Sequence, residues 1–377
     1  MSSIDTTSGT TVPTNTPTSA QPSALTNIAP SAATSATYVG INTEIGKGTY
    51  KTVYSCIETD DVNNKIFTLP HDVSIDKLVI AVLDINKIVK YLMDEKAQQL
   101  FETYIINPQN FYPAIKQRWE AYLKRLIDNQ IKTINEEIEL QNLFFENQLA
   151  PKIYEHRFDE DKKMFYILEE KCGSSFLTYI KIQTNQSEDN FKKIVELVTK
   201  IADTGYINID IKPENTCTKF SEDGSLSEII ALDFDTDFFI NFDLTNEEIK
   251  EHGKIFMLTL FIAYLKKYAN IVFKKDIVKT HLDCKKIEDM LTFFARNTEI
   301  CAKEMHPIFM LYHYIITNPQ KGSCSFHQTH EQIENLTRII CSYIFLPTNR
   351  GSTKGGSRRP RKSRRSKKSK KSNKSRK

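Results

Sequence analysis

The sequence has no apolar run long enough to cross a membrane. Its longest, Ile255 to Leu265, is about half of the roughly 20 residues that a bilayer-spanning helix needs. The N-terminus also lacks the charged and then apolar segments of a secretory signal. We therefore expect a soluble protein of the cytoplasm.

Paired cysteines are absent as well. The seven cysteines are odd in number, widely scattered, and never form a Cys-x-x-Cys motif. This pattern favours reduced thiols over disulfides or a zinc site. His327 and His330 stand three residues apart, but no third ligand is near them in the sequence, so we expect no metal site there.

Acidic residues are missing from the C-terminal end. Residues 350–377 hold 15 of the 51 Lys and Arg residues, which leaves 36 against 47 Asp and Glu in the rest of the chain, a formal charge of −11. Such a cationic tail binds nucleic acid or another polyanion with steep salt dependence. It also fits a nuclear-import signal, an autophosphorylation segment or a solubilising tail, so the expected location extends to the nucleus or a virion.

Composition divides the chain into four parts. Residues 1–36 are rich in Ser, Thr and Pro and residues 347–377 in Gly, Ser, Lys and Arg, and neither has the apolar residues that would offset the cost of folding, so we expect both to be disordered. Between them, 37–171 reads as strands with helices and 172–346 as mostly helical, which predicts an α+β fold. Strands are expected within 38–58, 77–83, 152–157 and 164–169, and helices over 88–147 with a break near 107–113, over 190–204 before Gly205, and within 246–345.

The segment from Tyr206 to Phe238 carries the strongest chemical signal. It contains an Asp-x-Lys-Pro-x-Asn string, and then an apolar strand that ends in Asp233. Phosphoryl transfer to a hydroxyl needs a carboxylate that orients the nucleophile, a cation near the γ-phosphate, and oxygen ligands for Mg²⁺. We assign these roles to Asp210, to Lys212, and to Asn215 with Asp233.

This segment resembles the catalytic loop and metal-binding aspartate of the protein kinase superfamily. The resemblance implies a bilobal fold, with a small antiparallel sheet and an αC helix in an N-lobe (37–171) and a mostly helical C-lobe (172–346). The helical stretch is longer than one αC helix, so an inserted helix is expected before it. ATP and Mg²⁺ would be the cofactors and a protein serine or threonine the acceptor. The alternatives are a pseudokinase that acts as an interaction scaffold and a small-molecule kinase. The composition resembles that of proteins from large DNA viruses.

The string IGKGTYKTVY resembles the glycine loop of these kinases. Glycines let backbone amides approach phosphates, and a following valine would cover the adenine. The residues that would bind the nucleotide in this way, together with the third-strand alanine, are Ile45, Gly46, Gly48, Val53 and Ala81.

The phosphate-binding lysine of the third strand is missing, because Leu83 stands in its place. The with-no-lysine kinases carry this lysine in the glycine loop, within a string similar to GTYKTVY. By that resemblance Lys51 would reach the phosphates and pair with an αC glutamate. The alternatives are that Lys51 is a solvent-facing loop lysine and that Lys87 substitutes for it.

The αC glutamate is placed at Glu137, with Glu139 as the alternative. The strand over 164–168 and the residues after it resemble the hinge, where backbone groups of Glu169 and Lys171 would bind adenine. Leu168 would be the gatekeeper.

Three departures from the kinase pattern concern the metal site, the substrate and its control. Asp235 replaces the glycine that normally follows Asp-Phe, and we expect its side chain to face solvent, with a role in Mg²⁺ binding as the alternative. Only about a dozen residues separate Asp233 from the next helix, without Ala-Pro-Glu, so the peptide-binding platform is short or absent. The arginine that pairs with an activation-loop phosphate is also missing, since Asn208-Ile209 precedes Asp210, so switching by that route is not expected.

Overall fold

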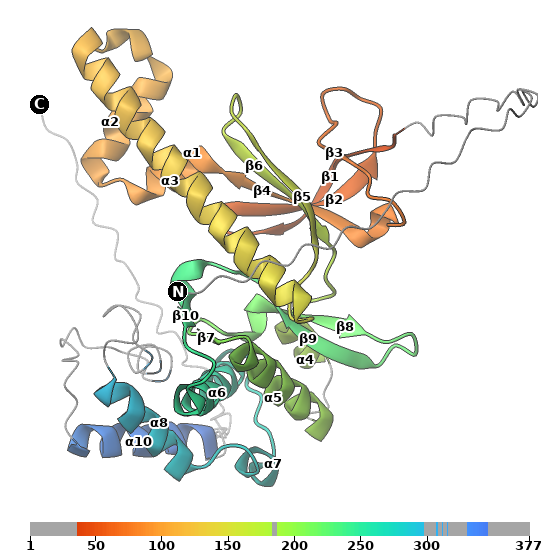
Figure 1. The fold of residues 1–377 in the computed structure, drawn as a ribbon, viewed down its shortest axis with the longest axis vertical. Helices are drawn as coiled ribbons and strands as arrows, with labels where there is room; N and C mark the ends of the chain where they lie inside the picture. The colour runs from red at the N-terminus through yellow and green to blue at the C-terminus, as the bar shows by residue number, and fades with distance from the viewer. Residues whose placement is uncertain are drawn as a thin grey trace, which may run out of the picture.

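A computed structural model describes residues 36–182, 187–297 and 330–345, together with Pro307, Leu311 and Ile315. It has an α+β fold, as predicted: a six-stranded antiparallel sheet comes first, and a mostly helical region with two small sheets follows (Figure 1). The N-terminal segment and the basic tail that were expected to be disordered lie outside the described residues, apart from Ala36.

The large sheet contains every strand expected from the first half of the chain. Its order is β3-β1-β2-β4-β6-β5, and all neighbours are antiparallel. The strands are β1 (Tyr38–Lys47), β2 (Lys51–Glu58), β3 (Phe67–Thr68), β4 (Leu78–Asp84), β5 (Ile153–Asp159) and β6 (Met164–Glu170).

The two faces of this sheet pack against different partners, because successive side chains of a strand point to opposite faces. One face carries Ala81 and Ile167 and packs against the long helix α3. The other carries Ile80 and Leu168 and packs against β1 and β3. We call the first of these the α3 face.

Three helices separate β4 from β5: α1 (Ile85–Leu92), α2 (Glu95–Ile106) and α3 (Pro113–Glu146). The expected break near residues 107–113 lies between α2 and α3. At 34 residues α3 is about 50 Å long, so it runs from the far tip of α2, across the sheet, to the helical region (Figure 1). Its Ile138 packs in the core of the sheet and its Phe144 in the core of the helical region.

The helical region is built around α5 (Glu188–Asp203) and the apolar α6 (Glu247–Tyr264). The helix expected over 190–204 is therefore confirmed, and Gly205 follows it at a φ of +84°, a conformation that glycine adopts without strain. Other helices of this region are α4 (Phe176–Ile182), a π-helix (Leu265–Ala269), α7 (Lys275–Lys279), α8 (Cys284–Arg296) and α10 (His330–Phe345).

Two small sheets complete this region. One pairs β7 (Tyr206–Asn208) with β10 (Phe239–Asn241), and the other pairs β8 (Thr216–Phe220) with β9 (Leu226–Ala231). Only β9 was expected from the sequence. Within the described ranges, no helix is both long and apolar enough to cross a membrane.

The expectation of reduced thiols is wrong for four cysteines. Cys172 is bonded to Cys217 and Cys284 to Cys341, while Cys56 has a free thiol. The bonded partners are 45 and 57 residues apart in sequence, but the fold brings their Cα atoms to 6.1 and 5.8 Å, which is within disulfide range. Spacing along the chain gives no sign of such pairs.

Candidate active site

The predicted catalytic residues Asp210, Lys212 and Asn215 lie together after β7, around a short turn at Pro213–Asn215. Asp210 is only 8% exposed, and its backbone N–H donates to Asn208 Oδ1 at 2.9 Å. Lys212 Nζ lies 2.6 Å from Asp210 Oδ2, and Asn215 Nδ2 donates to the same oxygen at 3.1 Å. A half-buried lysine and an amide thus both contact one oxygen of this carboxylate.

Asp233 joins the same group from the end of β9. The amide nitrogen of Asn215 donates to Asp233 Oδ2 at 3.2 Å, and the backbone N–H of Leu232 donates to the Asn215 carbonyl at 2.8 Å. Asp233 has a φ of +64°, which is uncommon for a residue with a side chain and turns the chain sharply after the strand. Asn215 therefore bridges the carboxylates of Asp210 and Asp233.

Asn215 and Asp233 fit a magnesium ion by the chemistry of their oxygens. No group of three or more His, Cys, Asp or Glu side chains in the described part of the chain could hold a metal by itself. Mg²⁺ commonly takes one or two carboxylates from a protein and the rest of its ligands from water and substrate phosphates. The pair therefore suits an ion that arrives with a nucleotide.

An aromatic contact fixes Asp233 relative to α3. Phe234 is buried, with its ring edge-on to Phe144 at 5.2 Å and stacked on Phe239 at 5.8 Å between centroids. Because Phe144 lies in the last turn of α3, the helix and the segment that carries Asp233 share one packed core. Sequence analysis did not identify Phe144 or Phe239, and only their apolar character signals them.

The glycine loop is the turn between β1 and β2. Gly48 N–H donates to the Lys51 carbonyl at 2.7 Å, and Gly46 pairs with Val53 across the strands. Val53 in turn pairs with the fully buried Ala81, while the predicted nucleotide-contacting Ile45 is 52% exposed.

Lys51 stands next to the empty lysine position. The strand register pairs Lys51 of β2 with Leu83 of β4, so their side chains leave the same face as direct cross-strand neighbours. Lys51 Nζ lies 3.5 Å from Glu169 Oε1 and not within ion-pair distance of Glu137. The alternative cation, Lys87, pairs with Asp84 at the start of α1 and its side chain is 68% exposed.

Of the two candidate glutamates on α3, Glu137 is half-buried and Glu139 is exposed. Burial raises the pKa of Glu137 to about 8, and nearby Asp235 and Asp233 contribute to the rise. Lys51 acts in the opposite direction, so its charge is felt at Glu137 without a direct ion pair. Glu137 therefore lies between the lysine of the sheet and the acidic segment of the helical region.

The expectation that Asp235 faces solvent is wrong. Its side chain is half-buried and accepts a hydrogen bond from the backbone N–H of Asp237 at 3.0 Å, which caps a short turn. Burial raises the pKa of Asp235, and the carboxylates of Asp237, Asp233 and Asp210 add to the effect.

The end of β6 differs from the expected hinge. Leu168 is buried on the face away from α3, so it does not line the face that carries Lys51, whereas Glu169 does. The backbone N–H of Lys171 donates to the Lys77 carbonyl at 2.7 Å, so this amide extends the sheet. In this structure it is not presented to an adenine.

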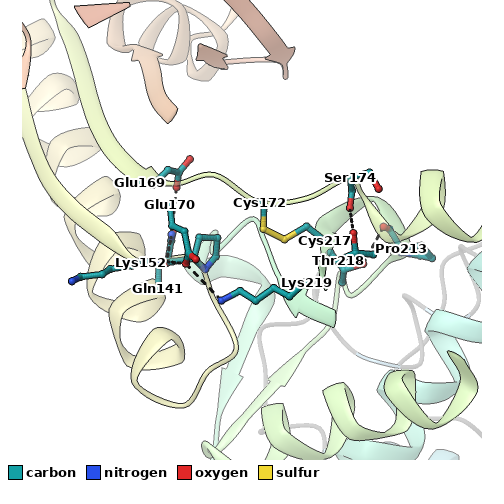
Figure 2. Close-up of a disulfide and its surroundings, with 12 residues drawn as sticks. Gln141, Lys152, Glu169, Glu170, Cys172, Ser174, Pro213, Cys217, Thr218 and Lys219 are labelled. Carbon is teal, nitrogen blue, oxygen red and sulfur yellow. Dashed lines mark hydrogen bonds and ion pairs between the residues drawn. A yellow bond between two sulfur atoms is a disulfide. The ribbon is translucent and has the colours of Figure 1, made fainter. Parts of the chain in front are cut away.

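A disulfide fastens the segment after β6 to the segment that follows Asn215 (Figure 2). Cys172 follows β6 by two residues, and its partner Cys217 stands two residues after Asn215. Beside this bond, Thr218 donates to the Ser174 carbonyl through both its backbone N–H and its hydroxyl, each at 3.1 Å. Gly173 is required here, because a Cβ atom would lie 2.3 Å from the Thr218 carbonyl oxygen.

The chain matches no protein-family model, and a search of curated proteins found no match to its sequence. The functional assignment therefore depends on the geometry of the site and on the order of its motifs.

Proposed function

We propose that this protein is an ATP- and Mg²⁺-dependent phosphotransferase with a bilobal, protein-kinase-like fold, and that its acceptor is a serine or threonine hydroxyl of a protein. The observation that carries the proposal is the hydrogen-bonded group of Asp210, Lys212, Asn215 and Asp233. Four residues that this chemistry requires meet at one place although they come from two separate segments. The six-stranded sheet before a mostly helical region supports the fold assignment.

Each residue has a defined task in the proposed reaction. Asp210 orients the acceptor hydroxyl and takes up its proton, since its carboxylate is fixed and mostly shielded from water. Lys212, which pairs with Asp210, would neutralise charge on the phosphoryl group during transfer. Asn215 and Asp233 would hold Mg²⁺, which supplies positive charge to the phosphate oxygens.

Lys51 would take the place of the missing third-strand lysine. Its position opposite Leu83 supports this role, because a lysine at position 51 or at position 83 would place its charge over the same part of the α3 face. Of the two candidates for the αC glutamate, Glu137 is the one we retain, since Glu139 is exposed. Gly46, Gly48, Val53 and Ala81 would surround the nucleotide. The backbone of Glu169 and Lys171 is not assigned to the adenine, because Glu169 pairs with Val79 within the sheet and the Lys171 amide donates to the Lys77 carbonyl.

A non-catalytic scaffold is the second candidate. Two observations favour it: the empty lysine position, and the engagement of Lys51 by Glu169 and of the Lys171 amide by Lys77. A small-molecule kinase is the third, because only a short turn and β10 separate Asp233 from α6. In every case the basic tail would supply affinity for nucleic acid or another polyanion, with a cytoplasmic, nuclear or virion location.

Incubation with labelled ATP and Mg²⁺ tests the proposal. The purified chain is assayed alone and with generic protein acceptors. Label on the chain or on an acceptor, dependent on Mg²⁺, supports a protein kinase. Nucleotide binding without transfer to any acceptor would favour the scaffold, and label only on small molecules would favour the third candidate.

A further inference from the structure

Glu169 is a buried charged residue on the α3 face of the sheet. It is 8% exposed, and the register places it opposite Val79, in the row that continues to Ser55 of β2. Burial of a carboxylate is costly unless it is paired. The contacts of Glu169 therefore show what satisfies it.

Two groups hold its two oxygens. Oε1 lies 3.5 Å from Lys51 Nζ, and Oε2 accepts from Gln141 Nε2 of α3 at 3.4 Å. Gln141 is itself buried, and it is held in place by a second hydrogen bond to the Pro151 carbonyl at 3.1 Å. Glu169 is thus a fixed acceptor, and Lys51 is the more exposed member of the pair, with 40% of its side chain open to solvent.

The ion pair reaches along the sheet. Lys51 starts in the row of Leu83 and Phe165, whereas Glu169 lies four residues further along β6, a distance of about 13 Å along an extended strand. The row between them contains Val53 and Ala81. The lysine side chain therefore extends over Val53 and Ala81, where the nucleotide base would bind in the proposed function.

Glu137 is not the ion-pair partner of Lys51 in this structure. Burial and the nearby aspartates raise the pKa of Glu137 to about 8, which favours its protonated form at neutral pH, and Glu137 is not within ion-pair distance of Lys51. Glu169 is therefore the residue that forms the ion pair with Lys51.

We propose that Glu169 positions Lys51 in the nucleotide-free protein, holding it across the Val53–Ala81 row so that a nucleotide must displace this ion pair to bind. The inference rests on the proposed function, since it concerns the same lysine and the same pocket. It predicts that Glu169 affects the affinity for nucleotide and leaves the transfer step nearly unchanged. A ligand that competes with an internal contact binds more weakly by the fraction of molecules in which the contact is open.

The test compares Glu169→Gln with Glu170→Gln. Glu170 is the matched control because it is the next residue and its side chain pairs with Lys219 instead. Glu169→Gln should tighten Mg²⁺–ADP binding and lower the KM for ATP by roughly three- to tenfold, with kcat within about twofold of the wild type. Glu170→Gln should leave both constants unchanged.

A double-mutant cycle assigns the effect to Lys51. In a Lys51→Met background, Glu169→Gln should no longer change the affinity for Mg²⁺–ADP, because the contact is already absent. An unchanged affinity in Glu169→Gln would overturn the inference. A loss of kcat as large as that of Lys51→Met would also overturn it, since Glu169 would then serve Lys51 during transfer.

These outcomes separate the inference from the proposed function. If Glu169→Gln binds nucleotide more tightly but the wild type transfers no phosphate, the displacement of the ion pair is supported and the proposed enzymatic activity is not. If the wild type transfers phosphate but Glu169→Gln leaves nucleotide affinity unchanged, the activity is supported and the displacement is not. If neither protein binds nucleotide, both proposals fail, and a thermal-unfolding cycle without nucleotide then reports only whether Lys51 and Glu169 interact.

Discussion

Replacement of Glu137 by glutamine should change how the stability of the protein depends on pH. The pKa of this carboxyl is raised from 4.5 to about 8, first by burial. Between these two values the folded protein keeps a proton that the unfolded chain has released. The free energy of unfolding therefore falls as pH rises from about 4.5 to about 8, and levels off above that.

The pKa values set an upper bound on the size of this effect. At about 1.4 kcal/mol per pKa unit, the cost at pH 8 and above is at most about 5 kcal/mol relative to acid pH. Because the side chain keeps some contact with water, we expect roughly half of that value. Glutamine has the shape of the protonated acid and does not titrate, so Glu137→Gln should be close to wild type near pH 4.5 and more stable by about 2–3 kcal/mol at pH 8.5.

Urea denaturation of metal-free protein at a series of pH values measures the difference. Glu139→Gln is the matched control, since Glu139 lies on the same helix but is exposed. Its curve should follow that of the wild type. Parallel curves of unfolding free energy against pH for the wild type and Glu137→Gln between pH 5 and 8 would show that Glu137 is not held in its protonated form. The raised pKa of Glu137 near Asp233 and Asp235 would then be wrong.

Three further outcomes are expected. Lys51→Met should lower turnover by roughly a hundredfold, and Leu83→Lys should partly restore that variant, because the two positions are cross-strand neighbours; no rescue would show that the lysine cannot act from β4. Deletion of residues 348–377 should abolish salt-sensitive binding to polyanions while transfer persists, and binding that survives the deletion would point to another surface. Replacement of Cys172 and Cys217 by serine should lower the melting temperature, because the disulfide closes a loop of 45 residues, whereas an unchanged melting temperature would show that the bond contributes little.

Hydrophobic periodicity was enough to predict most of the fold. The strands of the large sheet other than β3, and the helical stretch before β5, were placed within a few residues, because long segments with one buried face have a clear period. The short strands β3, β7, β8 and β10 were missed. Strands of two to five residues leave too few alternations to be recognised.

The candidate site was predictable where its residues are close in sequence. Asp210, Lys212 and Asn215 share one turn, so their meeting follows from the motif. The partner of Lys51 was not predictable, because it depends on the register of three strands and on which face each side chain leaves. The same holds for Leu168, since a shift of one residue along a strand reverses the face.

Buried charge was the hardest property to predict. Asp235 was expected in solvent because aspartate is usually exposed, but a short turn brings it close to Glu137. The disulfides were missed for a similar reason. Both depend on contacts between distant segments, which no local pattern records.

The central claim is that Asp210 serves the transfer of a phosphoryl group. Its most direct test is the Mg²⁺-dependent transfer of label from ATP by Asp210→Asn, with Glu214→Gln, an exposed acid of the same loop, as the control. We expect Asp210→Asn to lose transfer by at least about a hundredfold while Mg²⁺–ADP still raises its melting temperature, and Glu214→Gln to remain active. Transfer by Asp210→Asn at the rate of the wild type would contradict the account.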